Sequence, residues 1–124
     1  MEKENMLRVY QCEKCGCGKT VISKVELKLE GFKELVAGSV DAAKEKHVPV
    51  VTKKCKTVKV DVGSVAHPMT EEHLIEWVAL ETEQGYQVKY LTAGAEPVCT
   101  FTLADGDKAV AVYAYCNLHG LWKA

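Results

Sequence analysis

The sequence predicts an all-β protein, and three observations lead to this prediction. Apolar and polar residues alternate in TVKVDVG, so that Val58, Val60 and Val62 fall on one face of a strand and Lys59 and Asp61 on the other. The segments LIEWVAL, YQVKYL, PVCTFTL and AVAVYAYC are similarly apolar and are separated by ETEQG, TAGAE and ADGDK, which are rich in turn residues. A strand and turn recur about every dozen residues, which is typical of an antiparallel sandwich or barrel.

One stretch, SVDAAKEKHVPV, interrupts this alternation. Asp41 is a candidate cap for a short helical turn from Ala42 to Lys46. Pro49 disfavours helical geometry at the residue before it, so the turn should end near His47. We place a domain boundary near the AGSVD turn, which separates a cysteine-containing segment, residues 1–37, from a β-sandwich domain, residues 38–124.

Composition excludes several classes of protein. The 124 residues carry a formal net charge of −1, so no basic field indicates binding to nucleic acid or to an anionic membrane. The first residues lack the apolar run of a signal peptide, and no later stretch is long and apolar enough for a membrane span. We therefore expect a cytoplasmic protein, in which the six cysteines are mostly reduced and serve packing or metal binding.

The chain has only four histidines, and all of them are predicted to lie in loops or at strand edges. Thr70 is placed to cap a turn that brings the third histidine back toward the second. Together with one cysteine in YCNLHG they could form a square-pyramidal set of four imidazoles and a thiolate with one position open. Such ligands suit iron, copper or zinc. The candidate metal ligands are His47, His67, His73, Cys116 and His119.

Three motifs carry a resemblance to a known family. DAAKEKHVPV, VGSVAHPMTEEHLIEW and YCNLHGLWK resemble the superoxide reductase family, which comprises the desulfoferrodoxins and neelaredoxins, over about residues 39–124. The resemblance implies a seven-stranded immunoglobulin-like sandwich and a mononuclear non-haem iron with four equatorial histidines and an axial Cys116 thiolate. It also implies one-electron reduction of superoxide to hydrogen peroxide, with re-reduction of the iron by a donor such as rubredoxin. Backbone N–H groups at Leu118 or His119 could tune the sulfur.

Glu45 and Lys46 directly precede the first histidine. From residue type alone they are a solvated charged turn, because such pairs are common on helical surfaces. By the family resemblance, Glu45 is the carboxylate that occupies the sixth position of ferric iron at rest. Lys46 is the cation that attracts superoxide and orders water for proton delivery. This pair is expected to lie on a mobile loop.

The cysteines near the N-terminus differ from those of the longest family members. Those proteins carry a second iron centre made by a C-x-x-C pair and two adjacent cysteines. Here Cys12 and Cys15 resemble the first pair, but Cys17 follows and no adjacent pair is present. We expect no second iron centre, and the alternative is a zinc or labile metal held by these three thiols and one borrowed ligand.

Two other functions are compatible with part of this pattern. A C-terminal cysteine followed by histidine on a β-sandwich also fits a cupredoxin-like electron-transfer protein, but two further histidines argue against it. Met69 resembles a soft axial ligand, but with Cys116 and four histidines available we expect it to serve packing. A non-enzymatic immunoglobulin-like binding module is the other alternative. Trp122 is expected to shield the site from water. The family resemblance implies a homo-oligomer, a dimer or tetramer, and leaves the effect of Leu74 on the pocket open.

Overall fold

The computed structural model describes residues 6–14 and 18–124. Strands account for 47% of the structure and helix for 3%, which confirms the predicted all-β class. The chain divides into two compact units, residues 1–36 and Ala37–Ala124, each considered by itself below. Among the described residues no helix has the length and apolar character that crossing a membrane requires.

The N-terminal unit contains a small antiparallel sheet that the alternation pattern did not predict. Its strands are β1 (Arg8–Cys12), β2 (Thr20–Ser23) and β3 (Phe32–Glu34), in the order β2-β1-β3. An ion pair of 3.2 Å joins Arg8 to Glu34, and Cys12 lies opposite Phe32 in the register. Cys12 is half-buried, whereas Cys15 and Cys17 lie outside the described residues, so the expectation for a second metal stays a prediction.

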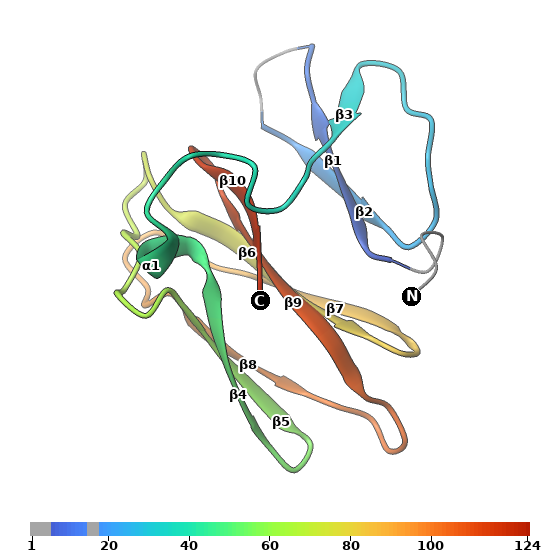
Figure 1. Ribbon diagram of the computed structural model, residues 1–124. Helices are drawn as coiled ribbons and strands as arrows, with labels where there is room; N and C mark the ends of the chain where they lie inside the picture. The colour runs from blue at the N-terminus through green and yellow to red at the C-terminus, as the bar shows by residue number, and fades with distance from the viewer. Residues whose placement is uncertain (1–5, 15–17) are drawn as a thin grey trace. The chain divides into compact units, whose positions relative to one another are not determined.

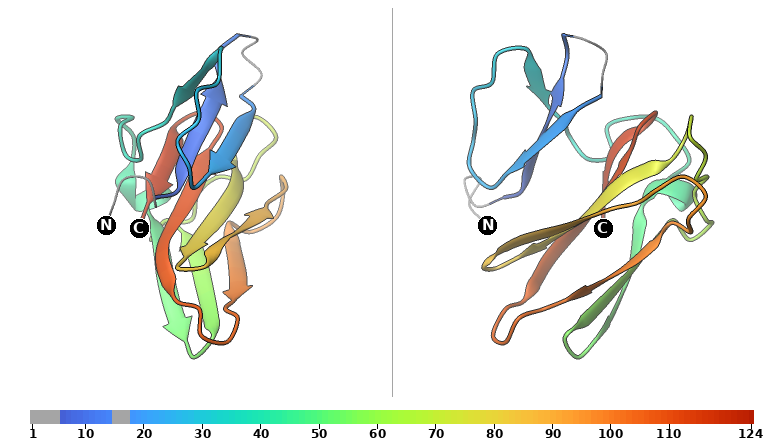
Figure 2. Two further views of the ribbon diagram at one scale, coloured as in Figure 1. Left: turned by 90° about the vertical axis from the view of Figure 1, so that its right-hand side faces the viewer. Right: turned by 180° about the vertical axis from the view of Figure 1, so that it is seen from behind.

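The C-terminal unit is a sandwich of two antiparallel sheets (Figures 1 and 2). One sheet has the order β4-β5-β8, and the other has the order β10-β9-β6-β7. The elements are α1 (Lys44–His47), β4 (Pro49–Lys54), β5 (Thr57–Val62), β6 (Ile75–Thr82), β7 (Gly85–Tyr90), β8 (Val98–Thr102), β9 (Ala109–Cys116) and β10 (Gly120–Lys123).

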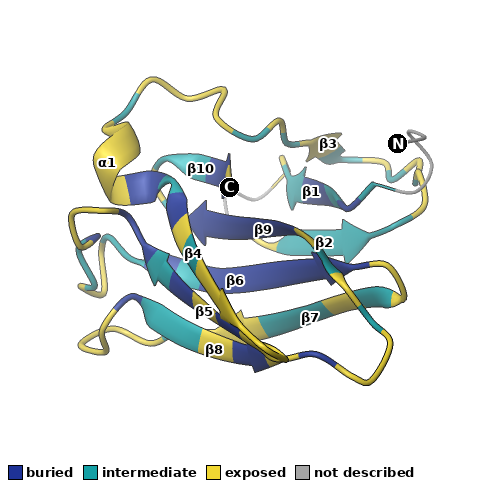
Figure 3. Ribbon diagram, turned by 60° about the horizontal axis from the view of Figure 1, so that its bottom comes forward, coloured by how far each residue is buried: buried dark blue, intermediate teal, exposed yellow. Residues whose placement is uncertain are grey.

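The core lies between these sheets, and β6 and β9 are buried along almost their whole length (Figure 3). Alternation places one apolar face of each strand inward, as predicted for TVKVDVG. The core cluster is formed by Val58, Val60, Val62, Ile75, Val78, Leu80, Phe101, Leu103, Val112, Ala114 and Cys116. Because Cys116 ends β9 inside this cluster, the core itself holds one of the candidate ligands at the end of the sandwich that carries α1.

The helical turn begins later than the sequence indicates. α1 runs from Lys44 to His47, and its N-cap position is Ala43 rather than Asp41. The predicted start was wrong because the Lys46 N–H donates to the Ala43 carbonyl at 3.2 Å and the Val48 N–H donates to the Lys44 carbonyl at 2.9 Å, which leaves Asp41 outside the first turn. The predicted end at His47 is confirmed, since Val48 is extended before Pro49.

Candidate metal centre

The four histidine rings stand at the corners of a square. The centroids of neighbouring rings are 4.7 Å apart for His47 and His67, 4.7 Å for His67 and His73, 5.0 Å for His73 and His119, and 4.9 Å for His119 and His47. One diagonal, between His47 and His73, is 6.5 Å. Neighbouring rings are steeply inclined to each other, with interplanar angles from 73° to 90°. The structure thus brings together residues from α1, from two positions of one loop, and from the turn after β9.

The ring nitrogens converge on one point. His47 Nε2 lies 3.2 Å from His67 Nε2 and 3.1 Å from His119 Nδ1. Ligands about 2.1 Å from a metal, the usual metal–imidazole distance, lie about 3 Å apart at adjacent corners of a square. The observed separations therefore match those of ligands around one ion in a planar arrangement.

The far sides of two rings are held by backbone carbonyls. His47 Nδ1 is 2.6 Å from the Ala43 oxygen, and His67 Nδ1 is 2.7 Å from the Pro68 oxygen. A proton on each Nδ1 satisfies these contacts, which leaves the Nε2 lone pair directed into the site. The indole of Trp122 stacks on His47 at 4.8 Å, and its N–H donates to the His119 carbonyl at 3.1 Å. Trp122 is buried and forms one wall of the site, as expected.

Burial favours the neutral form of three of these imidazoles. Loss of solvation lowers the pKa of His67 to about 4, and it also lowers the pKa of His47 and of His73. Neighbouring histidines lower the pKa of all three further. His73 Nε2 is buried and has no hydrogen-bond partner among the described residues. A buried ring nitrogen is costly to leave unpaired, and a metal ion would satisfy it.

The sulfur of Cys116 completes the cluster. His47, His67, His73 and Cys116 present ligand atoms that all lie within 4.8 Å of one another, and Cys116 Sγ is 3.9 Å from His119 Nδ1. Burial raises the pKa of the Cys116 thiol, while hydrogen bonds from the backbone N–H groups of Leu118 and His119 act in the opposite direction. Those bonds were predicted from the turn, and a bound cation would hold the sulfur as thiolate. Four imidazoles and one thiolate fit a mononuclear iron ion.

The loop between β5 and β6 presents His67 and His73 through a local turn. Thr70 Oγ1 accepts from the His73 N–H at 3.1 Å, and the Thr70 N–H donates to the His73 carbonyl at 2.9 Å. The predicted capping role of Thr70 is therefore confirmed. Met69 packs against the core, and its sulfur accepts a hydrogen bond from the Ile75 N–H at 3.4 Å. Its side chain therefore stabilises the loop and is not placed as a metal ligand.

Sequence reasoning missed Asn117, which joins the two halves of the site. Its Oδ1 accepts from the Leu74 N–H at 3.0 Å, its Nδ2 donates to the Glu72 carbonyl at 2.9 Å, and its own N–H donates to the Leu74 carbonyl at 3.2 Å. These bonds flank His73 and start from the residue after Cys116. The only signal in the sequence was an asparagine inside the CNLHG turn, which is also a common turn residue.

Glu45 and Lys46 lie on α1 with exposed side chains. The positive charge of Lys46 contributes to lowering the pKa of both His47 and His73, and the Glu45 carboxylate acts on His47 in the opposite direction. Both charges are thus close enough to influence the site. The pair does not lie on an irregular loop, because it occupies the helical turn that ends at His47.

Comparison with known proteins identifies the family. The sequence pattern of the Desulfoferrodoxin family matches residues 39–124, which is more than half of the chain. This chain belongs to the desulfoferrodoxin family. The desulfoferrodoxin of Nitratidesulfovibrio vulgaris is 44% identical over 97% of this chain and 97% of its own length. That of Syntrophotalea carbinolica is 42% identical over 95% of each chain.

Solved structures also resemble this chain. The superoxide reductase from Treponema pallidum superposes with a TM-score of 0.72 at 50% identity, covering 75% of this chain and 77% of that chain. The superoxide reductase (1Fe-SOR) from Giardia intestinalis has a TM-score of 0.56 at 36% identity, covering 65% of this chain and 96% of that one. Nearly the whole of the Giardia protein therefore corresponds to about two thirds of this chain.

Proposed function

We propose that this protein is a superoxide reductase that converts superoxide to hydrogen peroxide by one-electron reduction at a mononuclear iron. The observation that carries the proposal is the square of four imidazole rings with a buried thiol beside it. The names of its relatives support the same activity. The overall reaction adds one electron and two protons to superoxide.

In this proposal His47, His67, His73 and His119 would hold the iron through ring nitrogens, and Cys116 would hold it through its sulfur. When bound, the iron would supply one-electron redox chemistry, and a separate donor would restore its reduced state. Neutral imidazoles add no charge to the centre, so the Cys116 thiolate is the anionic donor that favours giving up an electron. The N–H groups of Leu118 and His119 withdraw density from the sulfur and moderate this effect.

Lys46 and Glu45 have separate roles in the proposal. Lys46 attracts the superoxide anion to the mouth of the site and orders the water that delivers protons. Glu45 would offer its carboxylate to the iron in the resting state and leave the site free for substrate. Both side chains are exposed and lie next to His47, which supports these assignments.

The proposal also covers the domain that carries the activity, the electron donor, the oligomeric state and the cellular compartment. Residues 38–124 carry the activity and residues 1–37 do not contribute ligands, in line with the short Giardia relative. The electron donor is a small redox protein such as rubredoxin, and the protein forms a dimer or tetramer. Among the described residues, Cys55, Cys99 and Cys116 are free thiols, which supports a reducing cytoplasm.

The test is to purify the protein without oxygen, count its metal and measure the products of its reaction with superoxide. We expect one iron per chain and one hydrogen peroxide for each superoxide consumed, without release of oxygen. A dismutase would release oxygen and form half as much peroxide. Copper in place of iron would instead support the cupredoxin-like carrier, and a metal-free protein would support the binding module.

A further inference from the structure

The turn after β5 packs against the backbone of α1 without room for a side chain. Gly63 is buried with φ +86°, and a Cβ at this position would lie 2.4 Å from the Val65 oxygen, 2.7 Å from the Glu45 oxygen and 2.7 Å from the Lys46 carbonyl carbon. These neighbours are all backbone atoms, so none can swing away as a flexible side chain would. The glycine therefore permits both a left-handed conformation and a close approach to α1.

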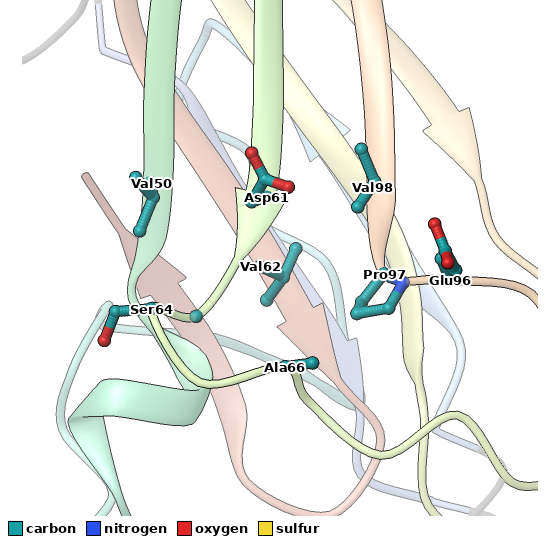
Figure 4. Close-up of a pocket in the computed structure, with 9 residues that line it drawn as sticks. Val50, Asp61, Val62, Ser64, Ala66, Glu96, Pro97 and Val98 are labelled. Carbon is teal, nitrogen blue, oxygen red and sulfur yellow. The ribbon is translucent and has the colours of Figure 1, made fainter.

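Hydrogen bonds hold the same contact. The Val65 N–H donates to the Glu45 carbonyl at 2.8 Å, and the Ser64 hydroxyl donates to the same oxygen at 3.3 Å. Figure 4 shows Ser64 on the stretch of chain that runs beside α1 after Val62. Gly63, Ser64 and Ala66 also line a hollow of about 560 Å³.

A four-residue helix depends on such support. One turn of helix is not stable by itself, because fixing its dihedrals costs more than its few hydrogen bonds return. The backbone at Glu45 is tied to the turn, while the side chains of Glu45 and Lys46 extend into solvent. Movement of the charged pair is thereby confined to side-chain rotation.

We infer that Gly63 is a positioning residue for Glu45 and Lys46. Because it has no side chain, the turn 63–65 can pack against α1, and this packing fixes the backbone of both charged residues relative to His47. This inference rests on the proposed superoxide reductase activity. Lys46 steers an anion only if its charge stays at the mouth of the site, and the seated turn sets that distance. A side chain at position 63 would push α1 outward and move the charge with it.

The test compares Gly63→Ala with Gly106→Ala. Gly106 has φ +82°, so its alanine variant suffers similar backbone strain, but no described atom lies within 4 Å of a Cβ built there. Each iron-loaded variant is mixed with superoxide by stopped flow at several ionic strengths. We expect Gly63→Ala to react about 3- to 10-fold more slowly at low salt, with a flatter salt dependence, and Gly106→Ala to react as wild type does.

A double-mutant cycle with Lys46→Ala separates positioning from general damage. If Gly63 acts through Lys46, adding Gly63→Ala to Lys46→Ala should slow the reaction by less than about 2-fold further. The inference would be overturned if the rate reductions of the two single variants multiplied fully in the double variant. It would also be overturned if Gly63→Ala reacted with the wild-type rate and the wild-type dependence on salt. A wild-type protein without superoxide reductase activity would instead refute the proposed function.

Hydrogen exchange on the wild-type protein keeps the inference testable if Gly63→Ala does not fold. The Val65 amide should be protected from exchange because it donates to Glu45, whereas a mobile α1 would leave it open. This measurement needs neither metal nor activity. Rapid exchange at Val65 in a folded protein would show that the turn does not hold α1, and the inference would fail.

Discussion

Asn117→Ala should weaken both the fold and the metal site, because its side chain ties the turn after β9 to the loop that carries His73. The change removes the bonds from the Leu74 N–H at 3.0 Å and to the Glu72 carbonyl at 2.9 Å. A net hydrogen bond contributes about 0.5–1.5 kcal/mol, and an N–H left unpaired in a half-buried place costs about 1–3 kcal/mol. Water can reach the exposed Glu72, so that bond counts at the low end.

The expected loss is about 2 kcal/mol, out of the roughly 5–15 kcal/mol by which a typical domain is stable. Urea unfolding of the metal-free and iron-loaded protein measures this loss. Because His73 is also less well placed, iron affinity should fall by about 10- to 100-fold, the range for residues that orient ligands. The retained backbone bond from the Asn117 N–H to the Leu74 carbonyl should keep the chain folded.

Two variants sharpen this prediction. Asn117→Asp keeps an acceptor for the Leu74 N–H but loses the donor to Glu72, so its effect should be smaller than that of alanine. Gln87→Ala removes a side-chain hydrogen bond of similar length, 2.9 Å to the Thr102 carbonyl, between strands rather than within the site loops. It should leave iron affinity unchanged. Wild-type iron affinity in a folded Asn117→Ala protein would refute the reasoning.

The remaining predictions concern the axial sulfur, the N-terminal unit and a core thiol. Cys116→Ser should still bind iron through imidazole but lose the sulfur-to-iron absorption band and most turnover; a retained band would assign the sulfur to another cysteine. A chain that begins at Ala37 should keep iron and superoxide reduction, measured as for the full chain, and loss of activity in a folded, loaded protein would contradict the domain assignment. Burial raises the pKa of Cys99 to about 11 from 9.0. The native protein therefore keeps a proton that the unfolded chain has lost, so stability should fall as pH rises from about 9 to 11. Cys99→Ala should reduce this slope in urea unfolding at pH 8 to 11, and the remaining slope should come from groups such as Cys116, whose pKa burial also raises. An unchanged slope would exclude Cys99 as a source.

The alternation in the sequence was sufficient for the sandwich strands and for the face of each that enters the core. Val58, Val60 and Val62 have 0%, 0% and 1% exposure, as a period of two requires. The N-terminal strands were not recognised, because the four residues of β2 are all half-buried and show no alternation. Short strands of this kind depend on their neighbours rather than on their own pattern.

The candidate ligands were also accessible from the sequence, because residue type and local turn chemistry are local properties. Thr70, for example, bonds within three residues of itself, so its role could be predicted from spacing alone. The structure adds that these ligands meet: His47 and His119 are 72 positions apart, and their nitrogens are 3.1 Å apart. No local pattern encodes such a distance, since it results from the packing of two sheets.

What only the tertiary structure decided are the contacts that hold the site in shape. The side chain of Asn117 donates to the carbonyl of Glu72, which is 45 positions earlier in the chain. Gly63 packs against the backbone carbonyl of Glu45, which belongs to α1. An asparagine or a glycine in a turn has an adequate local explanation, so the sequence gives no reason to look further. Their partners are backbone atoms, which every residue carries, and therefore leave no mark in residue type. The lowered pKa of His67 has the same origin, because burial belongs to the folded chain as a whole and not to the residues next to it.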